Sequence, residues 1–91
     1  MLSYDWRKNQ ENLRKHGLAL ADAYLFDFEG AVEEVQFEEG EERIKAFGEW
    51  NREFIAVVVF VDQGGEVVHV ISARRAERQE ILDYVRERSG A

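Results

Sequence analysis

Basic side chains gather in two short segments of this sequence, residues 12–17 and residues 71–76. The second segment lies where a strand is expected to end and a helix to begin, and the free backbone N–H groups of a helix start attract anions. Arginines at that position oppose the helix dipole. A bound phosphate would remove this conflict, although Glu77 and Glu80 could instead neutralise the arginines locally. The spacing therefore points to phosphate chemistry.

A second cationic group is expected on the helix predicted from Asp5 to His16. At 100° per residue, four of its polar residues share one side, away from Trp6 and Leu13. They are Lys8, Asn12, Lys15 and His16. This side is either an ordinary solvated helix surface or a phosphate-binding one. The role of His16 is open in the same way. It is either a proton shuttle or a basic cap of the helix C-terminus.

Arg43 begins an expected strand, and alternation places its side chain on the same face as Lys45. Arg43 either reaches a phosphate or pairs with Glu41 or Glu42. An exposed ion pair contributes only about 0 to 1 kcal/mol, so stability alone gives little reason for an arginine here.

Acid–base groups are expected on the C-terminal helix, where Glu77, Glu80 and Tyr84 line one side. A carboxylate and a phenol near Arg74 could transfer protons. The alternative is an ordinary helix edge with Tyr84 in the core. His69 is predicted to be a packed structural residue. Two separated histidines without cysteine do not give metal-ligand spacing, so we expect neither a metal nor another cofactor.

The net charge of −7 is concentrated in one segment, because residues 29–42 hold seven Glu and no Lys or Arg, against 12 acids and 12 bases elsewhere. This acidity argues against a broad nucleic-acid coat but not against a local cationic site. The chain has no cysteine, no signal-peptide pattern and no apolar run near the roughly 20 residues that span a bilayer. We therefore expect a cytoplasmic protein that forms one domain over residues 1–91.

The hydrophobic pattern predicts an α+β fold with two N-terminal helices, a curved and mainly antiparallel sheet of about four strands, and a C-terminal helix. Each helix is expected to turn its apolar side inward, including Tyr24 on the second helix and Ile81, Leu82 and Val85 on the last. The expected helices are 5–16, 20–28 and 76–88, and the expected strands are 32–37, 43–50, 53–61 and 66–73.

Taken in order from Tyr4 to Tyr84, these motifs resemble the BrnT family of toxins from bacterial type II toxin–antitoxin modules. Each motif is weak alone, but the ordered set is fairly specific. The set comprises Tyr4-Asp5, Lys8, Asn12-x-x-Lys15-His16-Gly17, Glu42-Arg43, Gly48, the run from Val70 to Ala76, Glu80 and Tyr84.

The resemblance implies a fold similar to RelE-type ribonucleases, metal-independent RNA cleavage, and silencing by a BrnA-like antitoxin with a ribbon-helix-helix region. Operator DNA would be bound only through that antitoxin. It also implies two groups of site residues. The catalytic candidates are Lys8, His16, Arg43, Arg74, Glu80 and Tyr84, and the RNA-binding candidates are Asn12, Lys15, Lys45 and Arg75. Because cations stabilise the charged transition state, loss of an arginine is expected to reduce activity more than loss of His16.

Two departures from the family pattern bear on this interpretation. Leu18-Ala19-Leu20 replaces a segment that commonly carries Ser or Thr, and a missing helix cap costs about 1 kcal/mol. The acidic segment 29–42 either repels RNA or recruits a basic antitoxin segment.

The leading hypothesis is a toxin that inhibits translation by cutting RNA. The alternatives are a catalytically weak antitoxin-binding module that acts in operator autoregulation and a free-standing acidic interaction domain. The nuclease hypothesis requires the cations to meet in one pocket, without each being neutralised by an acid.

Overall fold

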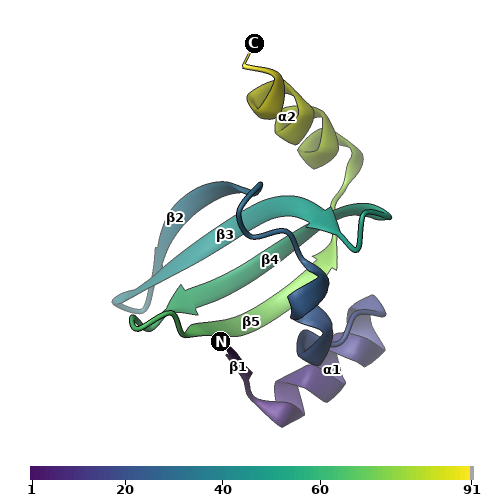
Figure 1. The fold of residues 1–91 in the computed structure, drawn as a ribbon. Coiled ribbons are helices and arrows are strands. Elements are labelled where there is room, and N and C mark those ends of the chain that lie inside the picture. Colours follow the sequence, from purple (N-terminus) through teal and green to yellow (C-terminus); the bar gives the residue numbers. More distant parts are fainter. Residues whose placement is uncertain (91) are drawn as a thin grey trace.

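Five strands form one twisted sheet, with helices on both of its sides (Figure 1). The computed structural model describes residues 1–90. The strand order is β1-β5-β4-β3-β2, with β1 parallel to β5 and every other pair antiparallel. The strands are β1 (Leu2–Tyr4), β2 (Val32–Glu38), β3 (Glu41–Trp50), β4 (Phe54–Asp62) and β5 (Val68–Arg75).

The turn between β3 and β4 follows the sequence prediction of a tight hairpin. Asn51 and Arg52 have φ angles of 53° and 61°. Positive φ at both central positions is the pattern of the type I′ turn, whose twist matches that of the flanking strands. The loop holds three residues, 51–53, and the strands pair from Trp50 and Phe54 onward.

Two α-helices and one 3₁₀-helix complete the fold: α1 (Trp6–His16), η1 (Leu20–Leu25) and α2 (Arg78–Ser89). The Asp5 carboxylate caps α1 by accepting hydrogen bonds from the N–H groups of Arg7 and Lys8, as its position before the helix predicts. Gly17 ends α1 at φ 75°, in the left-handed region. No helix within residues 1–90 is long and apolar enough to cross a membrane.

The hydrophobic core lies on the face of the sheet that η1 covers. Leu20, Ala23 and Phe26 pack there against small and branched side chains of the three central strands. The space is tight, since a Cβ at Gly48 would lie 3.0 Å from the Phe26 ring. The sheet contributes Ala46, Ala56, Val58, Phe60, Val70 and Ala73 to this core.

The sheet differs from the sequence prediction by one strand. The four expected strands are confirmed, with ends that differ by one or two residues. β1 was missed because three residues carry no alternation signal, and its parallel pairing with β5 joins positions more than 60 residues apart. The sheet therefore has five strands rather than about four, and it is mixed.

The second predicted helix was wrong in type and length. It is a 3₁₀-helix that ends at Leu25, because Phe26 leaves it to form an isolated bridge with Trp50. Tyr24, expected to point inward, is 70% exposed. A three-residue repeat explains this difference, since it rotates side chains away from the positions that a 3.6-residue repeat predicts.

The expected orientation of α1 was also reversed. Asn12 is 7% exposed, whereas Trp6 and Leu13 are 65% and 51% exposed. On α2, Tyr84 is buried while Leu82 and Val85 of the expected apolar side are exposed. Both helices thus approach the sheet through a polar or aromatic residue and leave aliphatic residues outside.

Candidate functional site

Three basic residues share the face of the sheet opposite the core. Phe47 on β3 pairs with Val57 on β4, and Val57 pairs with Arg74 on β5. Directly paired residues point to the same side of a sheet, so the Arg74 side chain lies on the same face as that of Phe47. Arg43 and Lys45 precede Phe47 by even numbers of residues on β3 and lie on this side too. We refer to Arg43, Lys45 and Arg74 as the cationic face.

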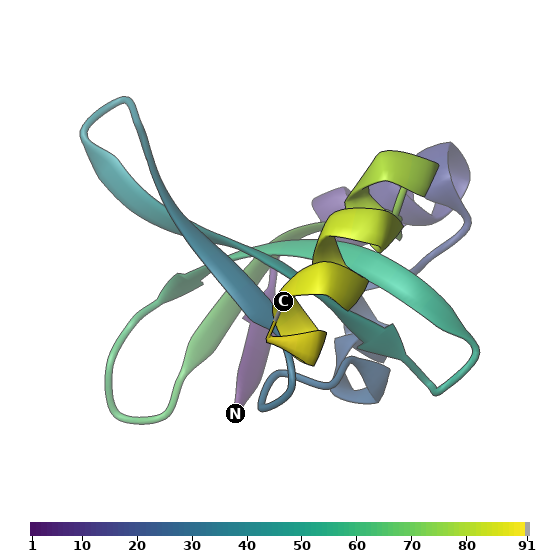
Figure 2. The ribbon, with the colours of Figure 1, turned by 90° about the horizontal axis from the view of Figure 1, so that it is seen from above.

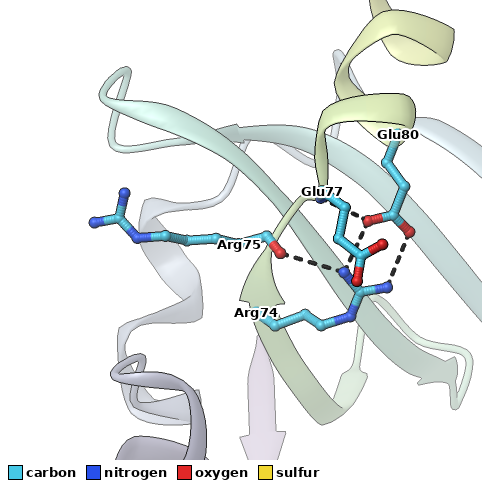
Figure 3. Close-up of polar contacts among 4 residues, drawn as sticks. All are labelled: Arg74, Arg75, Glu77 and Glu80. Carbon is cyan, nitrogen blue, oxygen red and sulfur yellow. Dashed lines mark hydrogen bonds and ion pairs between the residues drawn. The ribbon is translucent and has the colours of Figure 1, made fainter.

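Arg74 is held in place by Glu80 at the start of α2 (Figure 3). Its Nη1 and Nη2 atoms donate to the two oxygens of the Glu80 carboxylate at 2.8 and 2.9 Å, and Nη1 also donates to the Arg75 carbonyl at 3.2 Å. Glu80 further accepts a hydrogen bond from the Glu77 N–H at 2.8 Å. A guanidinium has five N–H donors. Arg74 is therefore oriented by three bonds and keeps donors for a ligand.

The hydrogen bonds from Arg74 lower the pKa of the Glu80 carboxyl from 4.5 to about 2, against the opposing effect of partial burial. The same pair raises the pKa of Arg74. A carboxylate with so low a pKa is a poor proton acceptor at neutral pH, because acid–base catalysis works best with a pKa near the operating pH. Glu80 is thus suited to positioning Arg74 rather than to moving a proton.

This ion pair predicts an acid-sensitive part of the stability. Because the pKa of Glu80 is lower in the folded state, the pair stabilises the fold above pH 4.5, and this contribution is lost as the pH falls towards 2. Urea unfolding at pH 7 and pH 3 should show a smaller loss of unfolding free energy for Glu80→Gln than for the wild type. The exposed change Glu87→Gln on the same helix is the control. Equal pH dependence of wild type and Glu80→Gln would contradict the assignment.

Arg43 is also paired with acids, but in a looser way. Its Nη1 lies 2.7 Å from Glu38 and its Nε 3.1 Å from Glu41, and the side chains of these glutamates are 63% and 53% exposed. Exposed ion pairs contribute about 0 to 1 kcal/mol. A phosphate group can therefore replace these partners at little cost.

Beside the cationic face, a hollow of about 570 Å³ lies between α2 and the β2–β3 pair. Lys45, Glu80 and Tyr84, all predicted from the sequence, contribute to its wall. Phe47 and Asp83 line it as well but were not among the predicted site residues. Alternation from Arg43 already pointed to Phe47, whereas Asp83 is recognisable only once α2 is placed over the sheet.

Arg75 lies away from this site. Figure 3 shows the side chains of Arg74 and Arg75 pointing in opposite directions, as neighbours on a strand do. The Arg75 guanidinium carbon is 3.9 Å from the centre of the Phe54 ring, a cation–π contact. The predicted pair of arginines is thus divided between the two faces of the sheet.

Asn12, expected to contact RNA, has its side chain committed to the backbone. Its amide nitrogen donates to the carbonyls of Leu18 and Ala73, each at 2.7 Å, and its amide oxygen accepts from the Ala73 N–H at 3.2 Å. The Asn12 side chain thus bonds both the N–H and the carbonyl of Ala73 on β5, as the backbone of a neighbouring strand would. It anchors α1 one residue before Arg74 and is not free to bind a ligand.

The remaining predicted residues, Lys8, Lys15 and His16, lie on α1, which packs against β5 and η1. Figures 1 and 2 show α1 on the other side of the sheet from α2. Within residues 1–90, no hydrogen bond or ion pair links these three side chains to the cationic face. The same part of the chain contains no cluster of three His, Asp or Glu residues suited to a metal ion.

Comparisons with known proteins identify a family. The family model described as the ribonuclease toxin BrnT of type II toxin–antitoxin systems matches residues 4–80. The 1.1 Å crystal structure of the Brucella abortus ribonuclease toxin BrnT is similar, with 35% identity and a TM-score of 0.67 over 85% of this chain and 96% of that one. No protein of curated function matches.

Proposed function

This chain belongs to the family of BrnT ribonuclease toxins of type II toxin–antitoxin systems, and from that membership we propose the reaction that it catalyses. It cleaves RNA in the cytoplasm without a metal ion and thereby inhibits translation. The 2′-oxygen attacks the adjacent phosphorus, a P–O2′ bond forms and the P–O5′ bond breaks. The 2′-hydroxyl loses its proton and the departing 5′-oxygen gains one. The products are a 2′,3′-cyclic phosphate and a 5′-hydroxyl.

The observation that supports this proposal best is the cationic face with its oriented arginine. During attack, negative charge builds up on the phosphate oxygens, and donors fixed in advance on that charge contribute about 3 to 4 kcal/mol each. Arg74 is fixed by Glu80 and retains free donors, while Arg43 and Lys45 lie on the same face. The planar guanidinium also matches the geometry of two phosphate oxygens.

The roles of the other candidates follow from their places. Tyr84 lines the hollow together with Glu80 and is the proton-transfer candidate next to the cationic face. Lys8, Lys15 and His16 on α1 form an outer basic surface that meets RNA beyond the cleaved linkage. His16 enters proton transfer only if the bound RNA reaches across the edge of β5.

A toxin of a type II system is paired with a cognate antitoxin. Here that partner is a BrnA-like protein with a ribbon-helix-helix region, which silences the toxin and carries the complex to operator DNA. The net charge of −7 supports this division, since DNA binding depends on neutralising phosphates with basic residues. The toxin then needs no DNA-binding surface of its own.

Expression of the chain alone tests the proposal. Wild type should slow growth and fragment cellular RNA, and the double variant Arg43→Ala, Arg74→Ala should do neither. With purified protein, cleavage should persist in EDTA and leave 2′,3′-cyclic phosphate ends. Dependence on a divalent ion, or equal RNA damage by both proteins, would contradict the mechanism.

A catalytically weak antitoxin-binding module is the second candidate. It is favoured by the acid partners of the two arginines on the cationic face, Glu38 and Glu41 for Arg43 and Glu80 for Arg74. In the same experiment this candidate predicts that wild type is harmless and still binds the antitoxin.

A further inference from the structure

The outer edge of β2 is open. The strand order places β2 last in the sheet with β3 as its neighbour, so in the described part of the chain no strand pairs with its outer edge. Figure 2 shows the β2–β3 hairpin projecting beyond the rest of the molecule. α2 lies over the first half of β2, where Val32, Glu33 and Glu34 line the hollow. From Val35 onward the strand extends past this cover.

The two faces of this strand differ in chemistry. Val35 and Phe37 alternate on the face that continues the core, and they are 59% and 72% exposed. Glu34 and Glu38 alternate on the other face, the side of the cationic face. Exposed apolar side chains on an open edge strand favour pairing with another chain, and proteins normally avoid them. Their presence here indicates a surface that is covered in the protein's working state.

The charge of this region restricts what can cover it. Residues 29–42 contain seven Glu and no Lys or Arg. A second copy of the chain would bring two glutamate-rich edges together, and like charges directly opposite each other destabilise a sheet. The same glutamates repel the negatively charged phosphates of RNA. A basic polypeptide in extended conformation satisfies both the open edge and the charge.

We propose that the free edge of β2 binds an extended segment of the cognate antitoxin as an additional strand. The segment alternates apolar residues, which pack on Val35 and Phe37, with Lys or Arg residues beside Glu34 and Glu38. Main-chain hydrogen bonds supply part of the affinity, and the alternation supplies the selectivity. The apolar contacts lie on the face opposite Arg43, Lys45 and Arg74, so changes at Val35 and Phe37 test docking without altering the cationic face.

The double variant Val35→Lys, Phe37→Lys tests the surface against a matched control. The control, Leu82→Lys, Val85→Lys, changes two other exposed apolar residues on α2, which are 48% and 55% exposed. Binding of each variant to the cognate antitoxin is measured by calorimetry. The β2 variant should bind about thirtyfold more weakly or worse, the effect expected of a hot spot, and the α2 variant should bind as wild type does. Wild-type affinity of the β2 variant would overturn the proposal.

Two further readouts make the result unambiguous. Thermal unfolding should be unchanged in both variants because the replaced side chains are exposed, and RNA cleavage by the β2 variant should equal that of wild type. Hydrogen exchange at the amides of residues 32–38 should slow in the complex. If affinity falls while these amides exchange as fast as in the free toxin, docking by strand addition is wrong. Loss of cleavage by the β2 variant would count against the proposed catalytic face, and its affinity for the antitoxin decides the docking proposal separately.

Discussion

Replacing Arg74 with alanine should lower the rate of RNA cleavage by about 10²- to 10³-fold, the effect of removing one preorganised donor from a charged transition state. The guanidinium is held by both oxygens of Glu80 and keeps donors free on the cationic face. Because Arg74 is only partly buried, the protein should remain folded. Single-turnover cleavage of a short RNA, with circular dichroism as a check of folding, measures the change.

Arg75 provides a matched control for this prediction. It is the next residue, carries the same charge and lies on the opposite face against Phe54. Arg75→Ala should therefore retain nearly full activity, and His16→Ala should lose less than Arg74→Ala does. Equal losses for Arg74→Ala and Arg75→Ala would show that charge near the helix start matters and the face of the sheet does not.

Replacing Asn12 with alanine should lower the free energy of unfolding by about 3 kcal/mol. The change leaves the Ala73 N–H and the carbonyls of Ala73 and Leu18 without their partner in a buried place. The anchor between α1 and β5 is lost at the same time. Urea denaturation at neutral pH measures the effect.

The exposed Lys8 on the same helix is the control for Asn12. Lys8→Ala should change the stability by no more than about 0.5 kcal/mol. An Asn12→Ala protein that is as stable as wild type and binds RNA more weakly would mean that Asn12 is a ligand-binding residue after all.

The sequence predicted those parts of the fold that depend on local signals. Asp5 and Gly17 mark the ends of α1, and Asn51 and Arg52 form the turn between β3 and β4. These features need only neighbouring residues. Alternation along β3 likewise placed Arg43 and Lys45 on one face before any partner strand was known.

The orientation of α1 could not be predicted in this way. Periodicity places Trp6 and Leu13 opposite Asn12 but does not say which side meets the sheet. Here the open backbone of β5 decides, because Asn12 pairs with Ala73 across 61 residues of sequence. A polar side chain that hydrogen-bonds to the backbone of a distant strand cannot be recognised from the residues next to it in the sequence.

The candidate site was predicted only in part, because it too depends on contacts between residues far apart in the sequence. Arg74 and Arg75 looked equivalent in a basic motif, yet β5 continues through both and separates them onto two faces. The role of Glu80 depends on α2 beginning just after β5, so that one carboxylate caps the helix and orients Arg74. Lys8 and His16 were grouped with the arginines through the family resemblance, and α1 keeps them on a separate element.

Titration of isotope-labelled protein with a short RNA whose 2′-hydroxyls are methylated tests the central claim most directly, because this RNA binds without being cleaved. Backbone and side-chain NMR shifts should change at Arg43, Lys45 and Arg74 and at Ser72, which pairs with Val59 on the same face. Arg75 and the core residues behind it should change little. Changes confined to α1, with none on the cationic face, would contradict the claim that this face binds the RNA phosphate.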